Sequence, residues 1–428
     1  MNQRDLPRIV FFFFLIGFVG ISLLISPARL QAEEALNAEE AFDGEKTSSI
    51  GIAVFNMAWA GAIGDFERHV EVCSAPEVNW CEPRAKIPRG EDRPSDEEEA
   101  RAKQCQKDFI SAAGGPGAAG MIAPCSAYGR RKHPAAAETV ENYNLKLDGL
   151  RATIENLIRA HGVQVIAFQE VRSQEVIQHV LGKFSGQFDV CVAPHTAFQT
   201  VAFAWDKSIL SGQHKCTPNQ DLAIAEHEGE SAHRVRPGLA LELTINDSPV
   251  TFLNIHLKSG CANLNNSGRW QGHRLTDPEP ACAVLNRQIP ILEDWIEQIA
   301  SHSPRFVLLG DFNRRIDEEA RARIARTRVR TDGSDPATAN IKDASGAVKS
   351  SYLWQEIADG SPQIYQVRLK SAKPGCKGLP GLDHIVVSGP IKRAQGGPLS
   401  SRKIALTRKS RQPIATSDHC PTIVNVEL

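Results

Sequence analysis

The chain has 428 residues, of which 42% are hydrophobic and 23% are charged, a composition that excludes a disordered or fibrous protein. Its length permits one large domain or two ordinary ones. The formal net charge of −1 gives no overall attraction to polyanions, so only local clusters of basic residues can indicate a nucleic acid as partner.

The N-terminal segment has the pattern of an export signal. Basic residues precede an almost unbroken apolar run over residues 9–25. Ser26, Pro27 and Ala28 break this run, and the small residue Ala32 follows before a polar, acidic stretch. We therefore predict a signal peptide at residues 1–32 and a polar linker at residues 33–48, and a periplasmic or secreted protein. Because the apolar run is close to membrane-spanning length, an uncleaved segment that anchors the protein to a membrane is the alternative.

Residues 49–428 are predicted to form one mixed α/β domain. Short apolar runs predict strands at residues 49–59, 163–168, 201–205, 239–245, 250–257, 306–309, 382–388 and 422–428. Apolar residues at three-four spacing predict helices over residues 147–158 and 285–299. Residues 61–137 interrupt this pattern with four cysteines, an acidic run and a glycine-rich stretch. We predict a loop-like, disulfide-rich insertion there.

The cysteines favour an oxidising compartment. There are ten of them, which fits an exported protein with disulfides: Cys73, Cys81, Cys105, Cys125, Cys191, Cys216, Cys261, Cys282, Cys376 and Cys420. None lies with histidines at the spacing of a zinc site, so zinc is not expected. Pairing cannot be deduced from the sequence, but Cys261 with Cys282 is attractive because the pair would close a polar loop after a candidate active-site strand.

Polar residues that bind metals or move protons repeatedly follow apolar strands. They are Asn56, Glu170, His256, Asp311, Asn313, Asp418 and His419. Sites form at such strand ends because each strand fixes its last side chain. Carboxylate and amide oxygens favour Mg²⁺, Mn²⁺ or Ca²⁺ over softer ions. Each residue alone also fits a turn, a helix cap or a buried histidine, so only the complete set indicates hydrolysis of a phosphate ester.

Five motifs resemble, in order, those of the endonuclease/exonuclease/phosphatase superfamily, which includes pancreatic-type deoxyribonuclease, exonuclease III-type nucleases, neutral sphingomyelinases and inositol polyphosphate 5-phosphatases. They are Phe168-Gln169-Glu170, Ile255-His256-Leu257-Lys258-Ser259, Gly310-Asp311-Phe312-Asn313, Leu382-Asp383-His384 and Ser417-Asp418-His419. The resemblance covers the chain from Ile50 to Leu428, apart from the insertion, which has no counterpart in the family pattern. It implies a four-layer αββα sandwich of two packed mixed β-sheets.

The resemblance also implies how the metal and the attacking water are held. Glu170 would be the main metal ligand, with Asn56 beside it and Asp418 as a further carboxylate on the metal side. Asp311 would orient or deprotonate the water, and Asn313 would hold the phosphate and Asp311 in register.

Other residues would contact the phosphate. His256 would donate to a phosphoryl oxygen, and His419 would stabilise the developing negative charge. Asp383 would brace an imidazole, preferably that of His419. Arg236 matches a position at which relatives contact phosphate. One departure is Gln199, which stands where relatives resembling pancreatic deoxyribonuclease carry a glutamate and which cannot brace a histidine as an anion.

Three functions are consistent with this sequence. An exported nuclease acting on DNA or RNA, with no stable protein partner implied, is favoured by basic stretches within residues 314–330 and 392–411, which form either solvated faces or a rim that attracts a polyanion. A phospholipid or sphingomyelin phosphodiesterase, or a phosphatase of small solutes, is the alternative, although the polar insertion offers no apolar hairpin for a membrane. A non-catalytic exported binding protein would have no chemical reason to keep every carboxylate and histidine.

Overall fold

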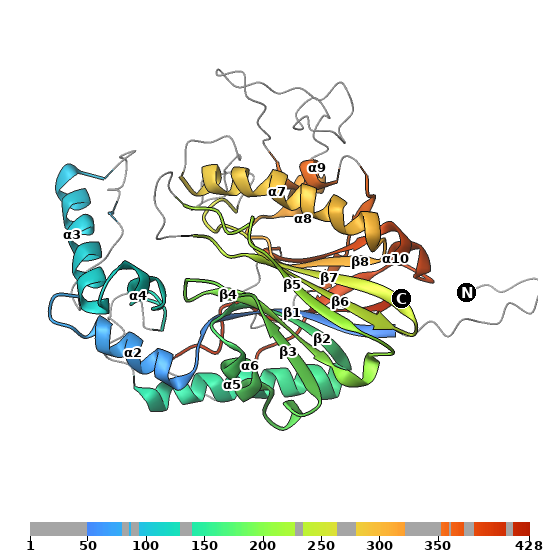
Figure 1. The fold of residues 1–428 in the computed structure, drawn as a ribbon, viewed down its shortest axis with the longest axis horizontal. Coiled ribbons are helices and arrows are strands. Elements are labelled where there is room, and N and C mark those ends of the chain that lie inside the picture. Colours follow the sequence, from blue (N-terminus) through green and yellow to red (C-terminus); the bar gives the residue numbers. More distant parts are fainter. Residues whose placement is uncertain are drawn as a thin grey trace, which may run out of the picture. The chain divides into compact units, whose positions relative to one another are not determined.

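Two β-sheets form the centre of the computed structural model (Figure 1). The strands are β1 (Ser49–Ala60), β2 (Val163–Val171), β3 (Phe188–Val192), β4 (Thr200–Asp206), β5 (His214–Asn219), β6 (Gly238–Ile245), β7 (Ser248–His256), β8 (Phe306–Asp311), β9 (Ile364–Gln366), β10 (Arg368–Ser371), β11 (Asp383–Ser388), β12 (Ser400–Lys403) and β13 (Thr422–Glu427). The first sheet has the order β10-β12-β13-β1-β2-β4-β3 and the second β5-β6-β7-β8-β11-β9. Both are mixed, because the parallel pairs β1–β2 and β7–β8 have antiparallel neighbours.

The helices are α2 (Ile63–Cys73), α3 (Asp96–Ala113), α4 (Pro116–Gly120), α5 (Val140–His161), α6 (Gln174–Leu181), α7 (Pro280–His302), α8 (Ile316–Arg321), α9 (Leu353–Ile357) and α10 (Gly389–Ala394). The structure describes residues 49–78, 85–86, 94–128, 139–226, 234–262, 280–321, 352–358, 361–371, 381–407 and 414–428. The predicted signal peptide and linker lie outside these residues. None of the described helices is both long and apolar enough to cross a membrane.

Apolar side chains alternate between the two faces of the strands, which creates four layers. In β1, Ile52 and Val54 pack between the two sheets, whereas Phe55 packs on the opposite face against Leu147 of α5. On the outer face of the second sheet, residues of β7 and β8 pack against α7. Figure 1 shows α5 and α6 on one side of the two sheets and α7 on the other. The predicted αββα sandwich is therefore confirmed.

Most predicted elements are present. Every predicted strand falls on an observed one, and the two predicted helices lie within the longer helices α5 and α7. The strands that the sequence pattern did not indicate are β3, β5, β9, β10 and β12. Each of these strands has at most six residues, and β3 and β5 bury few side chains, so their sequences show little alternation.

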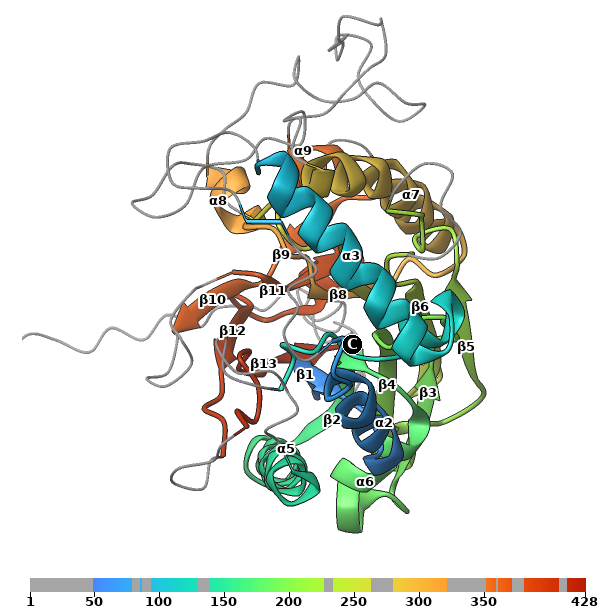
Figure 2. The ribbon, with the colours of Figure 1, turned by 90° about the vertical axis from the view of Figure 1, so that its left-hand side faces the viewer.

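The insertion after β1 is more helical than its sequence pattern indicates. The acidic run begins α3, where the side chain of Ser95 accepts a hydrogen bond from the backbone N–H of Glu98. Acidic residues in a first turn interact favourably with the helix dipole. Gly114, with φ of 88°, ends the helix in the left-handed conformation. Figures 1 and 2 show α2 and α3 at the end of the sandwich toward which β1 runs.

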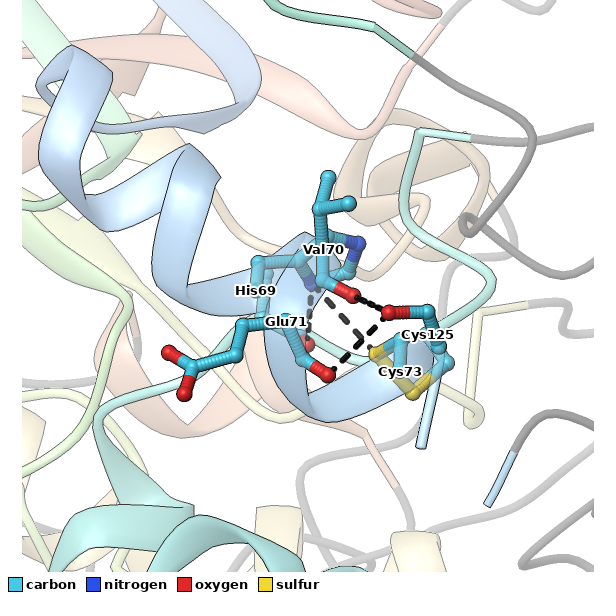
Figure 3. Close-up of a disulfide and its surroundings, with 7 residues drawn as sticks. His69, Val70, Glu71, Cys73 and Cys125 are labelled. Atoms are coloured by element: carbon cyan, nitrogen blue, oxygen red, sulfur yellow. Dashed lines mark hydrogen bonds between the residues drawn. A yellow bond between two sulfur atoms is a disulfide. The ribbon is translucent and has the colours of Figure 1, made fainter. Parts of the chain in front are cut away.

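A disulfide between Cys73 and Cys125 closes this insertion (Figure 3). Beside it lies the buried ring of His69, whose Nδ1 atom is 2.9 Å from the carbonyl oxygen of Ala123 and 3.8 Å from the sulfur of Cys73. Burial lowers the pKa of His69 to about 4, so this histidine is neutral at physiological pH. It packs edge-on against the ring of Tyr128, which supports a structural role in holding the insertion.

Two further disulfides stabilise the sandwich. Cys261 pairs with Cys282, as predicted, and Cys191 pairs with Cys216. Cys105 and Cys420 are also disulfide-bonded. Among the cysteines that the structure describes, none is a free thiol.

Candidate active site

The carboxyl ends of two parallel strand pairs carry four of the nine predicted site residues. Asn56 lies near the end of β1 and Glu170 near the end of β2, both in the first sheet. His256 ends β7 and Asp311 ends β8, in the second sheet, and the two are register partners. The contacts among these four side chains show that the two sheets contribute to a single site.

Three of the other predicted site residues lie close to the carboxylate of Asp311. Its Oδ2 atom accepts a hydrogen bond from Nδ2 of Asn56 at 3.1 Å. The Nε2 atom of His256 lies 3.6 Å from the same oxygen, and Nε2 of His419 lies 3.9 Å from it. Asp311 is almost completely buried, with 1% of its surface exposed. A buried carboxylate is therefore surrounded by an amide and two imidazoles that come from both sheets.

The turn after β8 fixes the other oxygen of Asp311. Its Oδ1 atom accepts the backbone N–H of Asn313 at 2.8 Å, and Nδ2 of Asn313 donates to the carbonyl oxygen of Leu257 at 3.0 Å. Asn313 has φ of 50°, a left-handed conformation that asparagine adopts more readily than most residues. The buried ring of Phe312 anchors the turn in the core. The backbone of Asn313 thus fixes the position of one oxygen of Asp311.

Glu170 projects from an irregularity in β2. The pairing with β4 shifts between Gln169 and Val171, and Glu170 itself has φ of 55°, a conformation that costs free energy and is concentrated at functional sites. Its Oε1 atom lies 3.8 Å from Nε2 of His256, and its side chain is 16% exposed. The local backbone thus turns this carboxylate toward the site and leaves it accessible.

A pair of buried amides behind Glu170 and His256 was not predicted. Nε2 of Gln169 donates to Oδ1 of Asn254 at 2.7 Å. Nδ2 of Asn254 donates to the carbonyl oxygens of Phe168 and Ala202. The pair links β2 to β7 across the two sheets and so fixes the register of their last residues. The available signal was a polar residue inside an otherwise apolar run just before each site residue.

Asp383 and His419 form a close pair. Nδ1 of His419 lies 2.9 and 3.0 Å from the two carboxylate oxygens of Asp383. The buried ammonium group of Lys403 lies 3.6 Å from Oδ2 of Asp383, a neighbour that the sequence did not indicate. Ser417 holds the loop, because its Oγ atom donates to the carbonyl oxygen of Asn56 and accepts the backbone N–H of His419.

Burial and neighbouring charges give the two histidines different charge states. Burial disfavours the charged imidazole of His419, but the negative charge of Asp383 and its hydrogen bond outweigh it and raise the pKa of His419 well above its ordinary value. Burial lowers the pKa of His256 well below its ordinary value, and the positive charges of Arg236 and His419 lower it further. The site thus contains one cationic and one neutral imidazole.

The carboxylates are also perturbed. Burial raises the pKa of Asp311 to about 7, against the opposing positive charge of His419. Burial raises the pKa of Glu170 too, and the negative charge of Asp418 adds to this effect. For Asp383, burial acts in the same direction, but the positive charge of His419 outweighs it and lowers the pKa. Crowded, buried carboxylates of this kind are stabilised by a bound cation.

Arg236 and Asp418 lie at the edge of this cluster. The nearly buried guanidinium of Arg236 donates through Nε to the carbonyl oxygen of His256 at 3.1 Å and through Nη2 to that of Leu257. It faces the negative charges of Glu170 and Asp311. Asp418 is exposed and close enough to Glu170 for its charge to act on that carboxyl. Both predicted residues therefore belong to the same region as Asp311.

The described arginines of the first basic stretch are paired within the fold. Arg314 is fully buried, and its Nε atom lies 2.6 Å from Glu319, which is also fully buried. The next two arginines pair with acidic neighbours on α8. Arg314 therefore does not belong to a rim that attracts a polyanion, because burial keeps it from any substrate. Residues 322–330 and 408–413, which complete the two stretches, lie outside the described residues.

The donor set fits a hard divalent cation. Among the described residues, Asp311, Asp383 and His419 each place one ligand atom within 4.8 Å of the others. The raised pKa of His419 favours the cationic ring, however, which has no free lone pair for a metal. Glu170 offers a further carboxylate beside these residues, with a side chain that is 16% exposed, and oxygen ligands suit Mg²⁺ and Mn²⁺.

A comparison with models of known protein families identifies the family of this chain. The model of the Endonuclease/Exonuclease/phosphatase family matches residues 141–419, which is more than half of the chain. The protein therefore belongs to this family of phosphoester hydrolases, as its motifs predicted. None of the curated proteins compared with the chain matches it.

Several solved structures resemble the fold. Truncated TDP2 of Caenorhabditis elegans has 14% identity and a TM-score of 0.37 over 66% of this chain and 91% of that one. ANGEL2, described as a 2′,3′-cyclic phosphatase, has 16% identity and a TM-score of 0.39 over 64% and 84%. A family member from Bacteroides vulgatus has 12% identity and a TM-score of 0.38 over 66% and 91%. Likeness at this level concerns the fold alone.

Proposed function

We propose that the protein is an exported, divalent-metal-dependent phosphodiesterase that cleaves nucleic acid. The observation that carries the proposal is the convergence of Asn56, His256 and His419 on one oxygen of Asp311. A carboxylate base, a cationic imidazole and an accessible carboxylate for a metal are together what phosphodiester hydrolysis requires.

Asp311 is the base that orients and deprotonates the attacking water. Its pKa of about 7 suits a base that works near neutral pH. Asn56 and Asn313 hold its two oxygens in place. Oδ1 of Asn56 accepts the backbone N–H of Ala58, which fixes the orientation of the amide. Nδ2 therefore points at Asp311, a role for Asn56 beside the metal contact predicted for it.

The two histidines and Arg236 bind the phosphate. The Nε2 atoms of His256 and His419 both lie within 4 Å of Oδ2 of Asp311, so a phosphoryl oxygen bound beside that carboxylate would be within reach of both rings. His419 is cationic and stabilises the negative charge that develops on the phosphoryl oxygens in the transition state, while Asp383 holds the ring in orientation. A divalent cation (Mg²⁺, Mn²⁺ or Ca²⁺) would be held by Glu170, Asp418 and Asn56. It would supply positive charge that neutralises the phosphate.

Two features support a nucleic acid over the other substrate classes. Arg172, which is half-buried, and Arg234, which is exposed, lie close enough to His195 for their charges to act on it together with that of Arg236, so cationic groups extend beyond the catalytic cluster. In the described part of the chain, Tyr365 is the one exposed large hydrophobic side chain. Cationic groups near the site and few exposed hydrophobic side chains favour contact with an extended polyanion over insertion into a lipid layer.

A panel of substrates tests the proposal. Purified protein with Mg²⁺ or Mn²⁺ is given plasmid DNA, RNA, sphingomyelin vesicles and inositol phosphates, each with and without EDTA. We expect cleavage of DNA or RNA that EDTA abolishes. Cleavage of sphingomyelin or inositol phosphates alone would contradict the nucleic acid substrate, and cleavage that persists in EDTA would contradict the metal.

Export has its own test. The disulfides support it, because such bonds persist in oxidising compartments. Mass spectrometry of protein recovered from the periplasm or medium should give a chain that begins at Glu33. An intact N-terminus in a membrane fraction would instead support the anchored alternative, and reduced protein in the cytosol would contradict export.

A further inference from the structure

Lys146 is a buried lysine that belongs to none of the family motifs. It lies on α5 and is 1% exposed, which is rare for lysine because a buried ammonium group loses its hydration. Its Nζ atom donates to the carbonyl oxygen of Met57 at 2.9 Å and to that of Thr416 at 2.7 Å. A methionine or leucine would fill the same space in this apolar interface without the cost of burying a charge.

The two carbonyl groups belong to segments that carry site residues. Met57 directly follows Asn56 in β1, and Thr416 directly precedes Ser417, Asp418 and His419. The hydroxyl of Ser417 donates to the carbonyl oxygen of Asn56 at 2.8 Å. The loop is therefore joined to the end of β1 at two neighbouring points, once directly through Ser417 and once through Lys146.

We propose that Lys146 is a positioning residue for hydrolysis, which fixes the loop carrying Asp418 and His419 against the end of β1 carrying Asn56. This inference rests on the proposed function, since it concerns the same site. It explains why a charged group is retained where an apolar one would pack. A neutral amine keeps two N–H donors, so both hydrogen bonds persist whether or not Lys146 is protonated.

The charge of Lys146 has a second consequence for the site. It faces the negative charges of Asp418 and Glu170, which oppose the effect of burial on its own pKa. Burial lowers the pKa of Lys146 to about 7, so at and below neutral pH the protonated amine reduces the repulsion between these two carboxylates.

The test compares two substitutions on the same face of α5. Lys146→Met keeps the volume but removes both hydrogen bonds, and Leu150→Ala, in the adjacent turn, removes buried apolar contacts only. We expect Lys146→Met to lower kcat by about tenfold to a hundredfold with little change in KM, because a small displacement of catalytic groups has effects of this size. Leu150→Ala should lower Tm and leave kcat unchanged at temperatures where the protein is folded.

Amide hydrogen exchange of the metal-free protein gives a readout independent of activity. The backbone N–H of His419 donates to Ser417, so its exchange should become faster in Lys146→Met and stay unchanged in Leu150→Ala. Lys146→Gln, which retains two N–H donors on a shorter side chain, should give an intermediate kcat and replaces Lys146→Met if that variant does not fold.

Normal kcat and normal exchange in Lys146→Met would overturn the proposal, as would an equal loss of kcat in Leu150→Ala. These outcomes differ from failure of the proposed function. If the wild-type protein cleaves no phosphodiester, the hydrolase assignment is contradicted, while the exchange experiment still decides whether Lys146 holds the loop.

Discussion

Nδ1 of His419 lies 2.9 and 3.0 Å from the two carboxylate oxygens of Asp383. The two residues come from different elements, since Asp383 begins β11 and His419 lies in the loop before β13. Their pairing leaves Nε2 as the ring atom that faces Asp311, at 3.9 Å from its Oδ2 atom. One carboxylate thus fixes both the orientation and the charge of the imidazole.

This pairing predicts the effect of changing either residue. His419→Ala should lower kcat by about 10²- to 10⁴-fold, because a positioned proton donor contributes an effect of that size. Asp383→Asn should lower kcat less and bring the pKa of His419 down toward its ordinary value of 6.5. Histidine ring resonances of the metal-free protein, followed by NMR against pH, give that pKa. His302→Ala, at an exposed helix end, is the control and should change neither quantity; an unchanged His419 titration in Asp383→Asn would refute the pairing.

Glu170 should control the affinity for metal. Addition of Mg²⁺ or Mn²⁺ should raise the Tm of the wild-type protein, because a ligand that binds only the folded state stabilises it. Glu170→Gln should remove most of this increase and raise the metal concentration that gives half-maximal activity. Glu175→Gln, on the exposed side of α6, should respond to metal like the wild type. An equal Tm increase in Glu170→Gln would place the metal elsewhere.

Asp311 should make the metal-free protein less stable as the pH rises. Its pKa is about 7 when folded, against an ordinary value of 3.8. Between these values the folded state binds the extra proton, so the free energy of unfolding falls with rising pH. Asp311→Asn lacks this titration. The difference between its Tm and the Tm of the wild type should therefore become more positive as the pH is raised from 4 to above 7. Measured in EDTA, a difference in Tm that is constant over this range would contradict the raised pKa.

The buried pair of Arg314 and Glu319 should be structural. Arg314→Met leaves Glu319 as an uncompensated buried charge, which costs on the order of 3–5 kcal/mol. Arg321→Met, at a surface pair with Asp317, should cost less than about 1 kcal/mol. Chemical denaturation gives both values. Neither substitution should alter the salt dependence of nucleic acid binding, and a weaker dependence in Arg314→Met would show that this arginine contacts the substrate.

The sequence indicated which residues meet around Asp311, because polar residues that can bind metals or move protons stand at the ends of recognisable strands. Glu170 and Asp311 follow apolar runs, and the ends of parallel strands meet at one edge of a sheet. Which histidine Asp383 contacts was less certain from the sequence. The contact forms between β11 in one sheet and the loop before β13 in the other, so it depends on how the two sheets pack. No local pattern carries that information.

Other features were hidden for different physical reasons. Lys146 is a charged residue on an amphipathic helix, where a solvent-exposed position is the usual expectation, and only the three-dimensional structure shows the two carbonyl groups that bind it. The acidic first turn of α3 resembles a charged loop in sequence. Its helix is stabilised by the Ser95 cap and by the disulfide bond of Cys105, neither of which produces an apolar periodicity.

The most direct test of the central claim is the initial rate of phosphodiester cleavage by metal-free protein as Mg²⁺ is added, measured for the wild type and for Asp311→Asn. We expect no turnover before Mg²⁺ is added, saturable turnover afterwards in the wild type, and at least a hundredfold lower turnover in Asp311→Asn at every Mg²⁺ concentration. Turnover without metal, or a similar rate in both proteins, would contradict a metal-dependent hydrolysis centred on Asp311.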